Sequence, residues 1–147
     1  MQTIERIPVA ANLFQGEGRE TRLIGSRCRS CGTHYFPKSL GCRNPQCRDK
    51  AIEDALLGPH GTLYSYTVQI YRPPALFRME PFAPYAIGMV ELEQGLRVMG
   101  MLTGCASDAL RIGMALELTV ETLYRDEQGR DVSTYKFQPA MHREIAR

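Results

Sequence analysis

Four of the five cysteines gather between residues 28 and 47, and their spacing constrains the fold more than any other feature of the sequence. They form two close pairs, Cys28-x2-Cys31 and Cys42-x4-Cys47, separated by ten residues. A structural zinc ion takes four thiolates in a tetrahedron, at about 2.3 Å each, so each pair has to come from one tight turn. The pattern predicts a four-cysteine zinc ribbon.

The residues around the cysteines favour such turns. Gly32 follows the first pair directly and tolerates a positive φ, and Asn44-Pro45 favours a turn inside the second pair. Between the pairs, residues 33–36 can form a short strand that ends at Pro37. The sequence therefore predicts two knuckles joined by a hairpin.

The alternative for two cysteine pairs is two disulfides, which require an oxidising compartment. The first fourteen residues carry Glu5 and lack an apolar run long enough for a signal peptide. No later stretch approaches the length of a membrane span. We therefore expect a cytoplasmic protein without membrane contact, in which the thiols stay reduced and bind metal.

Charge is distributed unevenly along the 147 residues, although the net charge is only +2. Residues 1–50 hold nine Lys and Arg against four Asp and Glu, which is +5, and the remaining residues hold nine against twelve, which is −3. The positive charge could meet phosphates or an acidic partner. It could equally offset the −2 of a zinc ion bound by four thiolates.

Residues 1–22 are predicted to form an N-terminal helical segment. A helix over residues 9–15 would lie between Pro8 and Gly16, with Val9, Leu13 and Phe14 near one face. Two turns are marginal without packing partners. We expect the ribbon to follow over residues 23–57, entered by a strand over residues 21–24, and a second domain to span residues 58–147.

The second domain shows the period-two alternation of β-strands. In the first strand, Tyr64, Tyr66, Val68 and Ile70 are predicted to share a half-buried face. Gly95 is expected to supply the positive φ of a hairpin turn between the second and third strands. A single helical turn is expected over residues 107–113. The five predicted strands cover residues 62–71, 85–93, 96–103, 114–124 and 132–138.

Five strands with a short helical turn after the third are typical of an OB-fold barrel. The fold class is thus mostly β, and the alternative is a small antiparallel sandwich. The loop over residues 72–84, RPPALFRMEPFAP, is unusually apolar and is expected to cover something, either a ligand or the barrel's own core. The loop over residues 125–131 would lie at the same ligand face.

These segments together resemble the zinc-ribbon/OB-fold family of acyl-CoA-associated proteins, once known only as a domain of unknown function. The resemblance rests on SRCRSCG, YFP, the second cysteine pair, GTLYSYT and PYAIGMVELEQGLRVMGMLTG, in that order. It implies an accessory subunit that accompanies a thiolase-like catalytic subunit acting on coenzyme A thioesters. The family's zinc ligands fall on Cys28, Cys31, Cys42 and Cys47. The second knuckle departs from the family by being wider than the usual two intervening residues.

We expect no active site within this chain. A thiolase needs a nucleophilic cysteine and a base. Cys105 is the one cysteine outside the cluster, and we interpret it as a small buried hydrophobe. His34, inside the hairpin, is a candidate substitute ligand or a partner of the ligands. Four thiolates leave no open position on the metal for a catalytic water.

Without an active site, the function expected of this chain is to help bind a coenzyme A thioester. Arginine suits phosphates through bidentate hydrogen bonds, and aromatic or apolar side chains suit the adenine or acyl group. The candidates around the ribbon are Arg19, Arg22, Arg27, Arg29, Arg43 and Arg48. Those on the long loop are Arg72, Phe77, Arg78 and Phe82, with Tyr71 beside them.

Two other functions remain compatible with the sequence. A zinc ribbon joined to an OB-fold can bind nucleic acid, but the acidic barrel half and the thin interleaving of aromatic and basic residues make nucleic acid an unlikely partner. A purely structural adaptor would contact protein alone.

Overall fold

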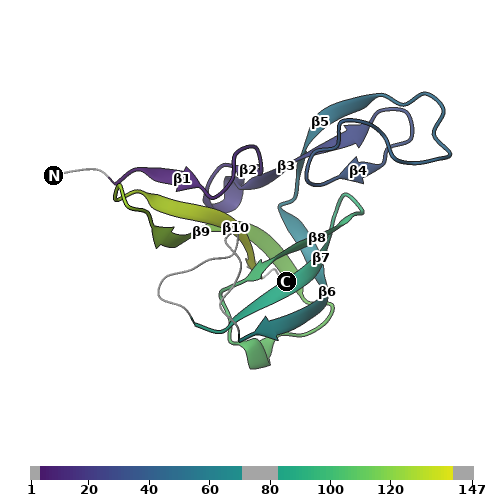
Figure 1. Cartoon of the computed structure of the whole chain (residues 1–147). Helices are drawn as coiled ribbons and strands as arrows, with labels where there is room; N and C mark the ends of the chain where they lie inside the picture. Colours follow the sequence, from purple (N-terminus) through teal and green to yellow (C-terminus); the bar gives the residue numbers. More distant parts are fainter. Residues whose placement is uncertain (1–3, 71–82, 141–147) are drawn as a thin grey trace.

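The structure is a computed structural model that describes residues 4–70 and 83–140. In these ranges the chain forms two β-sheets and no α-helix. A four-stranded sheet makes up the ribbon, and a six-stranded sheet closes on itself as a barrel. The loops at the far end of the ribbon project away from the barrel (Figure 1). The mostly β fold class is confirmed.

The ribbon is built on strand β3 (Arg22–Cys28), which leads directly into the first cysteine pair. Strands β2 (Phe14–Gln15) and β4 (His34–Tyr35) pair with the same edge of β3, β2 near its start and β4 near its end. Strand β5 (Ile52–Leu57) pairs with the other edge, from Leu23 to Cys28. The short strand predicted between the cysteine pairs is therefore present as β4, which forms a hairpin with β3. Strand β3 pairs with every other strand of the ribbon sheet.

The barrel contains the five predicted strands, and the predicted helical turn is the short 3-10 turn η3 (Ser107–Ala109). The hairpin turn before β8 contains Gly95 at φ 93°, as expected. Because β9 pairs with both β6 and β10, the sheet closes, which excludes the sandwich alternative. The strands are β6 (His60–Gln69), β7 (Tyr85–Leu92), β8 (Arg97–Leu102), β9 (Ala115–Arg125) and β10 (Asp131–Pro139).

The predicted N-terminal helix is wrong. The segment instead contains β1 (Arg6–Pro8), β2 and the 3-10 turn η1 (Gly18–Glu20). Strand β1 pairs in parallel with β10, and the Val9 N–H donates to the Ser133 carbonyl at 2.7 Å. Asn12, with φ 62°, turns the chain back where a helix would continue. A two-turn helix cannot compete with a ladder that satisfies the backbone in this way.

The predicted half-buried face of the first barrel strand is also wrong, because its residues are exposed. Strand β6 contains a bulge: Leu63 pairs with Val90 and Ser65 with Met89, so Tyr64 is the extra residue. The bulge is not the cause of the exposure, because Tyr66 and Val68 lie opposite Gly88 and Ala86, on the side of Leu63 and Val90. Leu63 is buried at 1% exposure. The four residues expected to be half-buried are 38–66% exposed: Tyr64, Tyr66, Val68 and Ile70.

One contiguous core fills the barrel and continues into the base of the ribbon. Phe137 is fully buried beneath β8, where a side chain on Gly100 would collide with its ring. Leu23 and Leu57 bring β3 and β5 into the same cluster. The other members are Leu63, Ala86, Val90, Leu92, Val98, Leu110, Leu116 and Leu118. No helix among the described residues has the length and apolar character needed to cross a membrane.

Candidate metal centre and ligand-binding residues

The four clustered cysteines converge at the far end of the ribbon. Their sulfur atoms all lie within 4.8 Å of one another. Cys28 Sγ lies 3.7 Å from Cys47 Sγ, and Cys31 Sγ lies 3.6 Å from Cys42 Sγ. A tetrahedron with zinc–sulfur bonds of about 2.3 Å has edges of about 3.8 Å, which both of these separations match, so the four sulfurs are gathered closely enough to bind one zinc ion.

Backbone hydrogen bonds shape both turns that carry the cysteines. In the first, the Gly32 N–H donates to the Cys28 carbonyl at 2.8 Å, and Gly32 has the expected positive φ of 80°. In the second, the Cys47 N–H donates to the Asn44 carbonyl at 3.0 Å, and the Asn44 side chain accepts from the Gln46 N–H. The wider second knuckle therefore closes as a turn, and both pairs present their sulfurs inward.

Cys28, Cys31 and Cys47 differ in pKa because their surroundings differ. The hydroxyl of Thr33, 3.2 Å from Cys31 Sγ, is the main cause that lowers the pKa of Cys31 to about 5. A backbone N–H, that of Ala51, likewise lowers the pKa of Cys28. Burial raises the pKa of Cys47 to about 12. Four thiolates this close repel one another, so the fully ionised set requires a cation, as in a structural zinc site.

Two neighbours of the sulfurs were not singled out from the sequence. Thr33 contacts Cys31, and the Tyr35 hydroxyl lies 3.6 Å from Cys42 Sγ while accepting the Arg43 N–H at 2.8 Å. Their position in the sequence, directly after the first knuckle, could have indicated that they lie near the sulfurs. His34 is not part of the converging group of ligands.

The arginines predicted to bind phosphate are only partly gathered. Arg27 and Arg29 lie on either side of Glu53, at 3.3 Å and 3.9 Å from its carboxylate. Arg22 donates to the carbonyls of Arg19 and Thr21, both at 2.9 Å. The exposed Arg43 and Arg48 lie farther along, in the second knuckle.

The remaining ligand candidates lie outside the described residues: Tyr71, Arg72, Phe77, Arg78 and Phe82. Whether the ribbon and loop candidates form one site therefore stays a prediction.

Cys105 is exposed, not buried as expected. It follows Gly104, whose φ of 84° turns the chain out of β8 toward η3. In the part of the chain that the structure describes, no hydrogen bond joins this thiol to a base.

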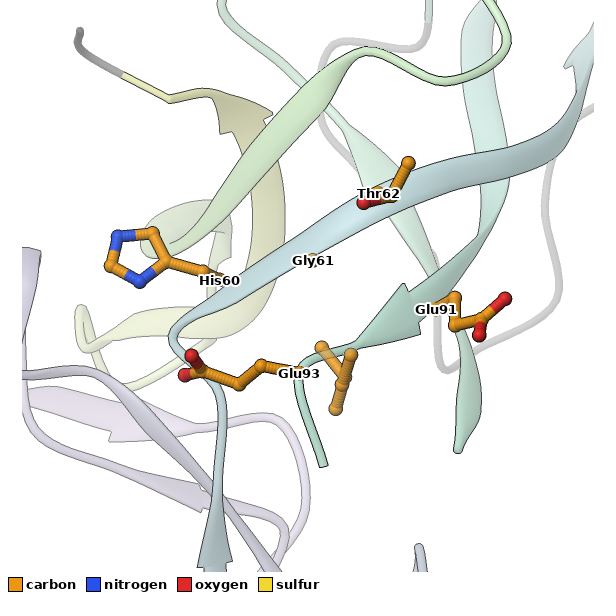
Figure 2. A pocket seen from close by; sticks show the side chains of 6 residues that line it. His60, Gly61, Thr62, Glu91 and Glu93 are labelled. Atoms are coloured by element: carbon orange, nitrogen blue, oxygen red, sulfur yellow. The ribbon is translucent and has the colours of Figure 1, made fainter. Parts of the chain in front are cut away.

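A pocket of about 400 Å³ lies where β6 meets the β7–β8 turn. It is lined by His60, Glu91 and Glu93, which are residue types that can act as general acids or bases. Figure 2 shows the Glu91 carboxylate pointing away from the His60 imidazole. The pocket therefore does not bring this acid and base together. Its other lining residues are Gly61, Thr62 and Leu92.

Comparison with known families accounts for both modules. Residues 16–53 match the rubredoxin-like zinc ribbon domain of ChsH2, and residues 55–121 match the C-terminal OB-fold domain of ChsH2. In the solved structure of an Ltp2-ChsH2(DUF35) aldolase, a chain with 30% sequence identity superposes with a TM-score of 0.61, covering 82% of this chain and 86% of the other.

Curated relatives match this chain over most of its length. A DUF35 domain-containing scaffold protein of Methanocaldococcus jannaschii is 38% identical over 80% of this chain and 81% of its own. The benzoylsuccinyl-CoA thiolase subunit BbsA of Thauera aromatica is 32% identical over 83% and 79% respectively. A probable enoyl-CoA hydratase alpha subunit of Thermomonospora curvata is 33% identical over 68% of this chain and 30% of its own. By its ribbon, its barrel and these relatives, the chain belongs to the DUF35 family of zinc-ribbon/OB-fold proteins.

Proposed function

We propose that this chain is a zinc-containing, non-catalytic accessory subunit of a thiolase-type acyl-CoA C-acyltransferase complex in the cytoplasm. Its ribbon holds one structural zinc ion on Cys28, Cys31, Cys42 and Cys47. Its surfaces assist assembly with a thiolase-like catalytic subunit and binding of the coenzyme A thioester. The relatives named as a thiolase subunit and as scaffold proteins support this assignment.

The observation that carries the proposal is the sulfur site. Four sulfurs at tetrahedral spacing fill the coordination of zinc and leave no position for a reacting water or carbonyl. Such a metal stabilises a fold and does not act as a Lewis acid. A chain whose cysteine cluster is committed in this way fits a supporting subunit.

Within this proposal, arginines of the ribbon contact the phosphates of coenzyme A. Arg27 and Arg29 are the best placed, because both side chains are substantially exposed and lie together beside Glu53. Exchange of that carboxylate for a phosphate would keep both guanidinium groups paired. Arg19 and Arg22 complete the ribbon set, and Arg72, Phe77, Arg78 and Phe82 belong to it from the long loop.

A narrower form of the proposal makes the complex a benzoylsuccinyl-CoA thiolase. The Thauera aromatica relative of that name supports it. The wider form covers other acyl groups, and the scaffold relatives support that form. Assaying the purified complex with benzoylsuccinyl-CoA and with a short-chain 3-ketoacyl-CoA separates the two.

The test is to purify the full chain from its native cell together with what binds it. We expect a thiolase-type subunit in constant stoichiometry, thiolase turnover in the complex, and none in this chain alone. The Arg27→Gln/Arg29→Gln variant should raise the KM for the thioester while zinc content stays at one ion per chain. Arg130→Gln, which alters an arginine paired with Asp126 at the other end of the molecule, is the matched control. Turnover by the isolated chain would refute the proposal.

A further inference from the structure

Leu40 is the most exposed large apolar side chain among the described residues, at 103% of its reference exposure. It lies in the middle of residues 37–43, which lead from β4 into the second cysteine pair. We call this segment the knuckle loop. Single exposed leucines are common on protein surfaces and need no explanation by themselves. The surroundings of this one set it apart.

The knuckle loop is fixed on both sides of Leu40. On one side, the Ser39 N–H donates at 2.9 Å to Ser26 Oγ, and Ser26 is fully buried in β3. Ser39 Oγ in turn donates to the Gly41 carbonyl at 2.6 Å, across the leucine. On the other side, the Arg43 N–H donates to the Tyr35 hydroxyl. Leu40 is thus held on a hydrogen-bonded segment and is exposed to solvent among the described residues.

Cations surround this apolar side chain. Lys38, which pairs with Asp54 at 3.3 Å, and Arg43 line the same open hollow as Leu40, about 590 Å³ in volume. The Arg43 guanidinium lies 4.8 Å above the Tyr35 ring, which orients it, and no ion pair occupies it among the described residues. From residue 38 to residue 50 the sequence has four Lys and Arg and one Asp. Three of the four clustered cysteines are buried, and Cys31 is exposed.

We infer that the knuckle loop is a docking element, with Leu40 entering an apolar pocket on the catalytic subunit whose rim carries carboxylates. The inference rests on the proposed function and adds the surface and its partner chemistry. Because the backbone on both sides of Leu40 is already hydrogen-bonded, the loop loses little freedom on binding, and the burial of the side chain is offset mainly by the loss of its own rotamer freedom. Exposed arginines at the edge of such a contact orient the partner and accelerate association through its acidic rim.

The test compares two exposed leucines of the ribbon with the same substitution. Leu40→Ala and Leu56→Ala each remove a side chain that is exposed, at 103% and 51%, so neither opens a cavity in the core. The affinity of each full-length variant for the co-purified thiolase-type subunit is measured by calorimetry, with zinc content as the check on folding. Leu40→Ala should weaken binding about 10- to 100-fold, as expected for a central anchor. Leu56→Ala should stay within about twofold.

A second arm tests the charge. Arg43→Glu should weaken binding further as salt is lowered, whereas wild-type binding should strengthen. Equal affinities for the two leucine variants would overturn the docking site while leaving the accessory role intact. A photoreactive residue at position 40 should crosslink to the catalytic subunit. Crosslinking to a second copy of this chain or to nucleic acid would likewise overturn it, and failure of the wild-type chain to bind any thiolase-type subunit would remove the proposed function itself.

Discussion

The ribbon and the barrel reach stability by different means. The barrel is built around a continuous apolar cluster that contains the fully buried Phe137. At its metal end, the ribbon has a cluster of just three buried cysteines with Ile52 packed against it. An area this small cannot offset the conformational entropy of ordering two knuckles. The comparison teaches that the ribbon depends on its ion and the barrel on burial.

The largest expected effect comes from removing a ligand of the ribbon. Cys28→Ser should release the zinc, because binding free energies of structural zinc sites are on the order of 10–16 kcal/mol and form part of the folding free energy. Elemental analysis should show loss of the ion. Hydrogen exchange should show lost protection in β4 and the knuckles, with protection of the barrel strands retained.

Cys47→Ser should behave in the same way, since its sulfur lies 3.7 Å from that of Cys28. Cys105→Ser is the control, since that thiol is exposed and apart from the cluster, and it should keep one zinc per chain. Stoichiometric zinc in either of the first two variants would show that the ligand set is wrong.

Next in size is the barrel's central side chain. Phe137→Ala should cost about 3–5 kcal/mol of unfolding free energy, because it leaves a cavity among Tyr135, Gly100 and the apolar cluster. Urea denaturation followed by circular dichroism measures this loss. Ile112→Ala, at a 61% exposed position, should change stability by less than about 0.5 kcal/mol. If a chelator abolished the difference between these two variants, the barrel would not be the independently stabilised part.

These two regions also differ in how far the sequence predicted them. The cysteine spacing and Gly32 encode the knuckles locally, so the predicted turns were confirmed. Strand alternation and the Gly95 turn likewise predicted the barrel hairpins. The parallel pairing of β1 with β10 joins residues more than a hundred positions apart, and no local pattern announces it.

Each error has its own physical cause. Spacing of apolar residues near position 9 suits a helix, but the unpaired edge of β10 satisfies more backbone groups. The bulge at Tyr64 interrupts a regular alternation without any glycine to mark it, and the residues that follow on the predicted face are exposed. For the ligand candidates, the sequence identified the arginines but not their partners: Glu53 for two of them and the Tyr35 ring for a third.

A smaller effect should appear at alkaline pH, in the barrel. Tyr135 packs between Phe14, Phe36 and Phe137, and burial raises its pKa from 10.0 to about 12. Because the folded state keeps the proton longer than the unfolded state, the contribution is complete below about pH 10 and is lost as pH rises toward 12. The loss should be on the order of 2 kcal/mol.

Tyr135→Phe isolates this contribution. At neutral pH the variant should be less stable by about 1 kcal/mol, because Tyr135 donates a 2.7 Å hydrogen bond to the Met99 carbonyl. As pH rises from about 10 toward 12 the two stability curves should converge and then cross, since the phenylalanine cannot ionise and the variant escapes the larger loss. Urea midpoints at both pH values measure this. Parallel curves for wild type and variant would mean that Tyr135 ionises as freely in the barrel as in the unfolded chain.

The smallest effect is expected at the turn between β9 and β10, which tests the barrel's surface against the ribbon's at acid pH. The Asp126 carboxylate accepts hydrogen bonds from the Arg130 N–H at 2.8 Å and the Gln128 N–H at 3.0 Å. The backbone N–H of Arg130 is the main cause that lowers the pKa of Asp126 below its ordinary 3.8. Its contribution is therefore present above that value and disappears as pH falls through the lowered pKa.

Asp126→Asn should accordingly be slightly less stable than wild type near neutral pH, and the gap should close in acid. Acid also releases zinc from thiolates, but it does so equally in both proteins, so the difference in Tm between them reports the turn alone. A gap that stays constant from about pH 6 to about pH 2 would show that the carboxylate binds its proton equally in the folded and unfolded states. The two regions should therefore differ most clearly in acid. Protonation of the cysteine ligands should unfold the ribbon, whereas protonation of Asp126 should lower the stability of the barrel only slightly.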